Sequence, residues 1–326
     1  MSNARQLAAN LPREGGLSNR NRIINGNFSI SQRGTSFSLS ADAYTLDRWT
    51  TSSAGGVSLS VSQQTATSSD NAYFPSKNYL RYTRNNAVLS GLVHKVEDLQ
   101  QFNNKTFTLS FWAKSPDLSN TMTPTIYTVN DGSSFNSYYS NITDVSDPAL
   151  SSTWQKYVFN ITFQDMYGYG FSGSHHLRLQ FGDGSAVGTL DIAEVQLEVG
   201  DTATPFEHPR SYGDELARCQ RYYSEIGGSS YVGINTGMQF STTGSVHGIQ
   251  YPVPMRTSPS VTQSNLIATD RTVFDHDLTG LSATTAGLTS VYVRTAWTTA
   301  AGAAGNAVLL AVKNGYTGGF QFDAEL

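Results

Sequence analysis

The 326-residue chain is poor in charged residues, with 21 Lys and Arg against 25 Asp and Glu and a formal net charge of −4. Charged residues make up 14% of the chain, against about 25% in an ordinary soluble protein. There is no excess of positive charge to neutralise phosphates, so a general nucleic-acid-binding role is excluded. No apolar run reaches the roughly 18 residues of a membrane span, and no membrane insertion is expected.

Cysteine is almost absent. Cys219 is the single cysteine of the chain, which excludes an intrachain disulfide framework and zinc sites built from several thiolates. The first ten residues lack the apolar core of a secretory signal. We therefore expect the protein to be made and assembled in a cytoplasm.

Small polar residues and aromatic residues are abundant in this chain, whereas charged residues are few. Ser and Thr account for 74 residues, and 17 Tyr, 16 Phe and 4 Trp supply enough apolar surface for a folded core. Many short segments alternate apolar and polar residues, without helical patterns between them: residues 57–61, 105–111, 157–163, 177–181 and 191–198, the last irregular near Ala193. This pattern predicts an all-β fold, an antiparallel sandwich or barrel whose Ser, Thr and Gln side chains face water.

One helix is predicted over residues 211–224. Ser211 followed by Asp214 is typical of a helix start, and Leu216, Cys219 and Tyr223 would share one face. We predict that this apolar face packs against copies of the chain, in the trimer that the family resemblance described below implies. The predicted organisation is a terminal segment, a β-sandwich, a linker helix and a small β-rich domain: residues 1–22, 23–208, 209–228 and 229–326.

Catalytic and metal motifs are scarce. None of the six histidines belongs to an H-E-x-x-H motif, and the acids Glu97, Asp98 and Asp165 have no spacing that marks a hydrolytic pair. His276 lies between two aspartates, where either a ligand cluster or a solvated loop is conceivable, and the loop is favoured. We expect a protein that is not an enzyme.

Aromatic side chains are the better candidates for ligand binding. Tyr138, Tyr139, Tyr167 and Tyr169 lie among Gly, Ser and Asn, outside regular alternation. Flat rings beside amides and hydroxyls suit the apolar C–H faces and hydroxyl groups of sugars. Packing of these rings over the sandwich core or between subunits remains the alternative.

The opening of the chain resembles a known family. Asn21–Phe28, Gln32–Ser36 and Asp47–Trp49 are similar to the first strand of carbohydrate-binding-module-like jelly rolls, in the variety seen in bacteriophage tail fibres. Further motifs that resemble this family follow in order along the chain: Leu109–Lys114, Trp154–Phe159, Ile192–Gly200, Thr204–Glu207 with the helix Tyr212–Tyr223, and Pro252–Val261. Together they cover about residues 21–261, and the linker helix is the most specific of them.

The resemblance implies a jelly-roll sandwich, a linker helix and a small C-terminal β domain in a homotrimeric virion adhesin. Sugar-binding relatives of this kind often carry a structural calcium, for which Asn25 and Asn27 match the loop ligands. Ala193 and Glu194 stand where the family has paired acids, so one ligand is missing and Glu194 is the acid that remains. We therefore expect no cofactor, with Asn25, Asn27 and Glu194 as weak calcium candidates.

The function predicted from these observations is that of a phage tail fibre located in the virion. Residues 1–22 would attach it to a tail or baseplate protein, while the jelly roll and the C-terminal domain bind a host cell-surface glycan. Two alternatives stay open. One is a capsule or lipopolysaccharide depolymerase of the tailspike kind, and the other is a purely structural collar or decoration protein.

Overall fold

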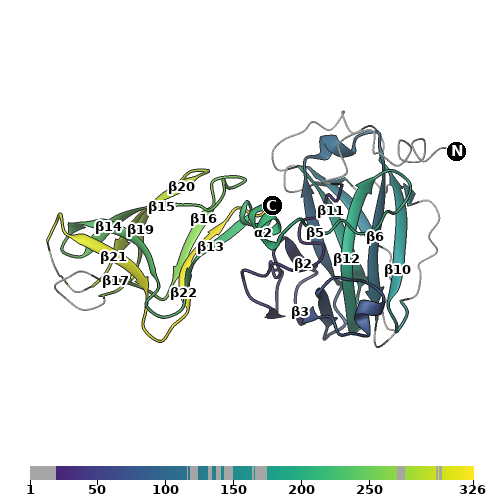
Figure 1. The fold of residues 1–326 in the computed structure, drawn as a ribbon, viewed down its shortest axis with the longest axis horizontal. Helices are drawn as coiled ribbons and strands as arrows, with labels where there is room; N and C mark the ends of the chain where they lie inside the picture. Colours follow the sequence, from purple (N-terminus) through teal and green to yellow (C-terminus); the bar gives the residue numbers. More distant parts are fainter. Residues whose placement is uncertain are drawn as a thin grey trace. The chain divides into compact units, whose positions relative to one another are not determined.

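The computed structural model describes most of the chain as β-strands with one α-helix, which confirms the all-β prediction (Figure 1). The described residues are 20–115, 117, 124–130, 134–136, 141–142, 150–163, 165, 175–269, 276–298, 300 and 303–326. They divide into two compact units, one up to Glu215 together with Leu326, and one from Leu216 to Glu325. Among these residues, no helix is both long enough and apolar enough to cross a membrane.

The first unit is a sandwich of two antiparallel sheets, as predicted. The seven-stranded sheet has the order β1 (Ser36–Leu39), β3 (Leu59–Thr65), β4 (Asn78–Arg84), β12 (Gly188–Val199), β6 (Thr106–Lys114), β10 (Gln155–Thr162) and β9 (Asn141–Ile142). The five-stranded sheet has the order β2 (Trp49–Ser53), β5 (Ser90–Glu97), β11 (His176–Gly184), β7 (Thr125–Asn130) and β8 (Ser134–Asn136). Alternate residues of both sheets, such as Leu109 and Leu179, are fully buried in one shared core.

The family-like motifs at the start of the chain contact one another. The side-chain amide of Asn25 donates to the backbone carbonyls of Ile30, at 2.8 Å, and Asp47, at 2.9 Å, and accepts from the Ile30 N–H at 3.0 Å. The Trp49 indole N–H donates to the Asn25 carbonyl at 3.1 Å. The carboxylate of Asp47 accepts from the backbone N–H of Gln32 at 2.7 Å. These segments hold one another in place because each satisfies buried polar groups of another.

The Asn25 turn also fits against an irregularity in β12. The Val195 N–H donates to the Gly26 carbonyl at 2.9 Å, and a Cβ atom at Gly26 would lie 2.2 Å from the Val195 carbonyl oxygen. The pairing of β12 with β6 shifts register between Ala193 and Gln196, as the sequence predicted near Ala193. Only glycine permits this close approach of the two backbones.

The second unit contains two further antiparallel sheets. The three-stranded sheet has the order β13 (Tyr223–Gly228), β22 (Gly318–Asp323) and β16 (Ser260–Ser264). The seven-stranded sheet has the order β18 (His276–Asp277), β17 (Leu266–Thr269), β21 (Ala307–Val312), β14 (Gly233–Ser241), β15 (Gly244–Gln250), β20 (Ser290–Ala296) and β19 (Gly280–Ala286). Side chains from both sheets, including Val293 and Phe322, form one buried cluster.

The helix predicted over residues 211–224 begins where expected but ends four residues earlier, at Gln220. Helix α2 spans Tyr212–Gln220, and the Asp214 N–H donates to the Ser211 hydroxyl at 3.1 Å. Tyr223 begins β13, where it pairs with Asp323. Leu216, Cys219 and Tyr223 therefore do not form one helical face, because the aromatic residues that follow the helix enter a sheet. Cys219 and Tyr223 are buried within the single chain, and the second unit begins inside the expected 209–228 linker.

We predict that Gly26→Ala lowers the free energy of unfolding by about 1–3 kcal/mol, since the added methyl group overlaps the Val195 carbonyl. Urea unfolding followed by tryptophan fluorescence measures the change. Gly213→Ala in helix α2 is the matched control, because its Cβ meets nothing closer than 3.8 Å. A Gly26→Ala chain as stable as the control would contradict the backbone contact.

The interior of the second unit contains a buried histidine. His247 is 2% exposed, and its Nε2 lies 2.7 Å from the Ser245 hydroxyl, which itself lies 2.7 Å from the Thr295 hydroxyl. Burial lowers the pKa of His247 to about 4 from its usual 6.5. The folded protein therefore holds this histidine neutral at pH values where the unfolded chain binds a proton.

We predict that stability falls as the pH drops from about 6.5 toward 4, because the unfolded chain takes up a proton that folded His247 refuses. The contribution of His247 is fully present above pH 6.5, and its loss amounts to about 2–4 kcal/mol near pH 4. Urea unfolding at pH 7 and pH 5 tests this for the wild type and His247→Gln. An equally steep loss in the variant would assign the pH dependence to other groups.

Candidate functional site

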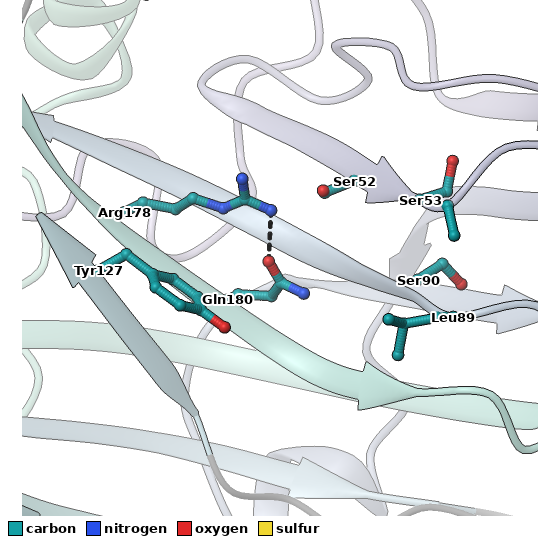
Figure 2. Close-up of a pocket in the computed structure, with 8 residues that line it drawn as sticks. Ser52, Ser53, Leu89, Ser90, Tyr127, Arg178 and Gln180 are labelled. Carbon is teal, nitrogen blue, oxygen red and sulfur yellow. Dashed lines mark hydrogen bonds between the residues drawn. The ribbon is translucent and has the colours of Figure 1, made fainter. Parts of the chain in front are cut away.

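A pocket of about 280 Å³ opens on the face of the five-stranded sheet that points away from the core (Figure 2). Four adjacent strands, β2, β5, β11 and β7, supply its walls. The residues that line it are Ser52, Ser53, Ala54, Leu89, Ser90, Tyr127, Arg178 and Gln180. The pocket is therefore built mainly from regular strands, which hold side chains in place more firmly than loops do.

Strand alternation places three of these side chains together. In β11, Leu177 and Leu179 enter the core, so Arg178 and Gln180 project from the opposite face. Arg178 pairs directly with Tyr127 of β7, and its guanidinium lies 5.7 Å from the centre of the Tyr127 ring. The Arg178 guanidinium also donates to the side-chain oxygen of Gln180, as the dashed line in Figure 2 shows.

A glycine in the neighbouring strand makes room for Gln180. A Cβ atom at Gly91 of β5 would lie 2.8 Å from Cγ and 2.9 Å from Nε2 of Gln180. Because Gly91 has no side chain, the Gln180 amide lies flat against β5 and leaves the space beside it open. Gln180 is 6% exposed, so its amide forms part of the pocket floor.

A buried arginine supports the rim of the pocket from within the sandwich. Arg84 of β4 is 1% exposed and donates to the Ser90 carbonyl at 2.7 Å and to the Ser90 hydroxyl at 3.0 Å. It also donates to the carbonyls of Gly182 and Ala186. Gly182 has a φ of +65° where the register of β11 and β5 shifts. The Arg84 guanidinium thus connects β5 and β11 at the rim to the seven-stranded sheet by hydrogen bonds.

The chemistry of this pocket suits binding better than hydrolysis. Its lining offers guanidinium and amide donors, an amide oxygen, serine groups and one phenol ring. None of the eight lining residues is acidic, and glycoside hydrolysis in its usual form requires two carboxyl groups. A ligand rich in hydroxyl groups could exchange hydrogen bonds with these side chains while it covers the Tyr127 ring.

Two carboxylates lie close to a shared lysine on the outer face of the seven-stranded sheet. Lys114 Nζ lies 3.2 Å from Asp70 and 3.9 Å from Asp191, which is also paired with Arg81 at 2.7 Å. Burial alone would raise the pKa of Asp70, but hydrogen bonds from Thr67 and other neighbours, including Lys114, hold it well below its usual range. A general acid needs a raised pKa, so this cluster suits a structural ion network rather than catalysis.

The residues predicted for a calcium site are used in other ways. The Asn25 side chain is fully occupied by the backbone of Ile30 and Asp47, while Asn27 Oδ1 accepts from the Ser29 N–H at 3.3 Å. Glu194 accepts from the Ser76 N–H and hydroxyl at 3.1 and 2.7 Å. Among the described residues, no cluster of three or more His, Cys, Asp or Glu could hold a metal ion. The oxygen atoms of Asn25, Asn27 and Glu194 are thus engaged in hydrogen bonds within the chain.

The predicted sugar-binding residues Tyr138, Tyr139, Tyr167 and Tyr169 lie outside the described residues. No sequence motif singles out Tyr127, Arg178 or Gln180. Residues 177–181 were predicted as a strand with one solvent-exposed face, and that face is the signal that could have identified Arg178 and Gln180. Their proximity to Tyr127 depends on strand pairing, which alternation alone does not reveal.

The chain matches no protein-family model and no curated protein sequence. Several solved structures are similar at low identity. The enzymatically active domain of tailspike protein 4 from bacteriophage CBA120 is 16% identical with a TM-score of 0.34, over 56% of this chain and 22% of that one. The module TmCBM61, in complex with β-1,4-galactotriose, is 14% identical with a TM-score of 0.32, over 56% and 99%. An apo-form cyclase from Fischerella sp. is 16% identical with a TM-score of 0.33, over 55% and 95%. Likenesses this weak assign neither a family nor an activity.

Proposed function

We propose that this protein binds a host cell-surface glycan without cleaving it, as a bacteriophage tail-fibre adhesin. The observation that carries the proposal is the cross-strand group of Tyr127, Arg178 and Gln180 in a pocket without acids. The family-like motifs at the start of the chain support the phage assignment. In this proposal the protein is made in the host cytoplasm, becomes part of the virion, and uses residues 1–22 to attach to a tail or baseplate protein.

Sugar recognition fits the geometry of the pocket. Arg178 and Gln180 project donors side by side, and vicinal hydroxyls of a sugar ring can accept from both. The Tyr127 ring offers an apolar surface for the C–H face of the sugar. At about 280 Å³ the pocket lies at the small end of ligand sites, so it would hold one or two sugar units weakly.

Weak single contacts become effective when several pockets engage one surface. Linked sites can raise the overall affinity by about 10²–10⁴ without any new contact. A trimeric fibre would present three copies of the pocket to the same cell. The low net charge of the chain would limit nonspecific electrostatic attachment to other surfaces.

The homotrimer proposal rests on an exposed apolar face of the second unit. Met238 and Phe240 of β14, Tyr292 of β20 and Leu309 of β21 are 52%, 43%, 41% and 39% exposed on one side of the seven-stranded sheet. Arg294 lies 5.3 Å from the centre of the Phe240 ring on the same side. Apolar patches of this kind mark interaction surfaces, and copies of the chain would cover it.

We predict that Arg178→Ala weakens binding to host cells by at least about tenfold, the loss expected for a hydrogen bond to a charged group. Flow cytometry of cells incubated with labelled full-length protein measures this, and a glycan array identifies the sugar. Lys156→Ala, which removes an exposed charge from the other sheet, should bind as the wild type does. Unchanged binding by Arg178→Ala would contradict the pocket assignment, and shortening of host polysaccharide would contradict the non-enzymatic role.

We predict a solution mass of three times the 35.3 kDa chain by light scattering at micromolar concentration. Leu309→Glu should reduce this mass, because it places a charge in the apolar face. Val187→Glu is the matched control, since Val187 is 51% exposed in the first unit. A monomeric wild type, or a trimer that survives Leu309→Glu, would contradict this interface.

A further inference from the structure

We infer that the second unit carries its own binding site for a neutral saccharide unit, in a pocket where β17 and β18 come close to the residues that follow β20 and β21. The choice of ligand class rests on the proposed function, whereas the site itself rests on the geometry. The pocket has a volume of about 520 Å³. It is lined by Tyr231, Ile267, His276, Asp277, Trp297, Thr298, Lys313 and Asn314.

The polar rim of the pocket is electrically balanced. Lys313 Nζ lies 2.6 Å from Asp277 Oδ2, and these side chains are 37% and 65% exposed. Their opposite charges cancel, so neither an anion nor a cation gains from entering. Both groups still offer hydrogen bonds: the ammonium donates and the carboxylate accepts.

The inner wall contains two nitrogen atoms without a hydrogen-bond partner. The rings of His276 and Trp297 stack at 5.7 Å with an angle of 14° between their planes. Trp297 is 4% exposed, and among the described residues neither its indole nitrogen nor His276 Nε2 has a hydrogen-bond partner. A buried donor left unpaired is unfavourable, so a ligand oxygen that accepts a hydrogen bond from it removes that penalty on binding. The His276 side chain is only partly buried and lines the pocket together with Trp297.

These features together select a neutral, hydroxyl-rich ligand. The indole N–H can only donate, so it needs an acceptor oxygen. The Asp277 carboxylate can only accept, so it needs a donor. A sugar hydroxyl group can donate to Asp277 and accept from the indole N–H. Tyr231 at the rim is 56% exposed and presents a flat apolar surface, which matches the C–H face of a sugar ring. A volume of about 520 Å³ lies within the usual range of small-molecule sites.

Nuclear magnetic resonance of the ¹⁵N-labelled full-length protein tests this inference. The four tryptophans give four indole N–H signals, and Trp297→Phe assigns the one from this pocket. The probes are D-glucose, D-galactose and N-acetyl-D-glucosamine at up to about 50 mM, which would saturate a millimolar site. We expect at least one probe to shift the Trp297 signal saturably, and Asp277→Asn to weaken that response about tenfold.

The controls separate this site from the first pocket. Arg178→Ala should leave the Trp297 response intact, and Trp112→Phe removes an indole N–H outside the pocket without changing it. If none of the three sugars moves the Trp297 signal, or if this N–H contacts only ordered water, the inference is overturned. Host binding that still depends on Arg178 would then leave the proposed function standing.

Discussion

The first unit depends on the turn at Asn25. The buried Asn25 residue forms hydrogen bonds with segments that lie far apart in the sequence. Its side chain bonds to the backbones of Ile30 and Asp47, and its own N–H donates to Glu215, which is 2% exposed. Asn25 has a φ of +59°, a conformation that asparagine tolerates better than most residues. The turn thereby fixes the opening of the chain against both the Asp47 region and the start of helix α2. Removal of this amide would leave several buried backbone groups without partners at once.

Buried polar groups that each satisfy several partners also explain how a chain with few charged residues forms a specific fold. Many of its charged residues are buried: Asp47, Arg48, Asp70, Arg84, Asp191, Glu194, Glu198 and Glu215. Inside the fold such a group can hold a fixed set of partners, as Arg84 does with the hydroxyl and carbonyl oxygens of Ser90 and the carbonyl of Gly182. These charged groups lie within the fold, and the surface carries the rest of the charged residues of a chain in which they make up only 14%. Such a surface recognises hydroxyl groups well and attracts few ions.

Sequence patterns predicted the β-sandwich because period-two alternation reports directly which side of a strand is buried. They also located the β12 irregularity near Ala193 and the start of helix α2 at Ser211. The end of that helix was missed, because Tyr223 fits a helical face and a strand equally well until β22 is present to pair with it. The pocket was missed for a related reason. Arg178 and Tyr127 are neighbours only through the register of β11 and β7, which depends on long-range pairing.

The two pockets differ in a way that bears on the proposed binding of a cell-surface glycan. The first contains an arginine and no acid, whereas the second balances Lys313 against Asp277 and adds the aromatic wall of Trp297. Two different weak sites on one chain discriminate better than two identical ones, because a surface must offer both ligands within reach. Their combined avidity depends on effective concentration rather than on tight single contacts. A receptor that displays two sugar environments would thus be preferred over one that displays either alone.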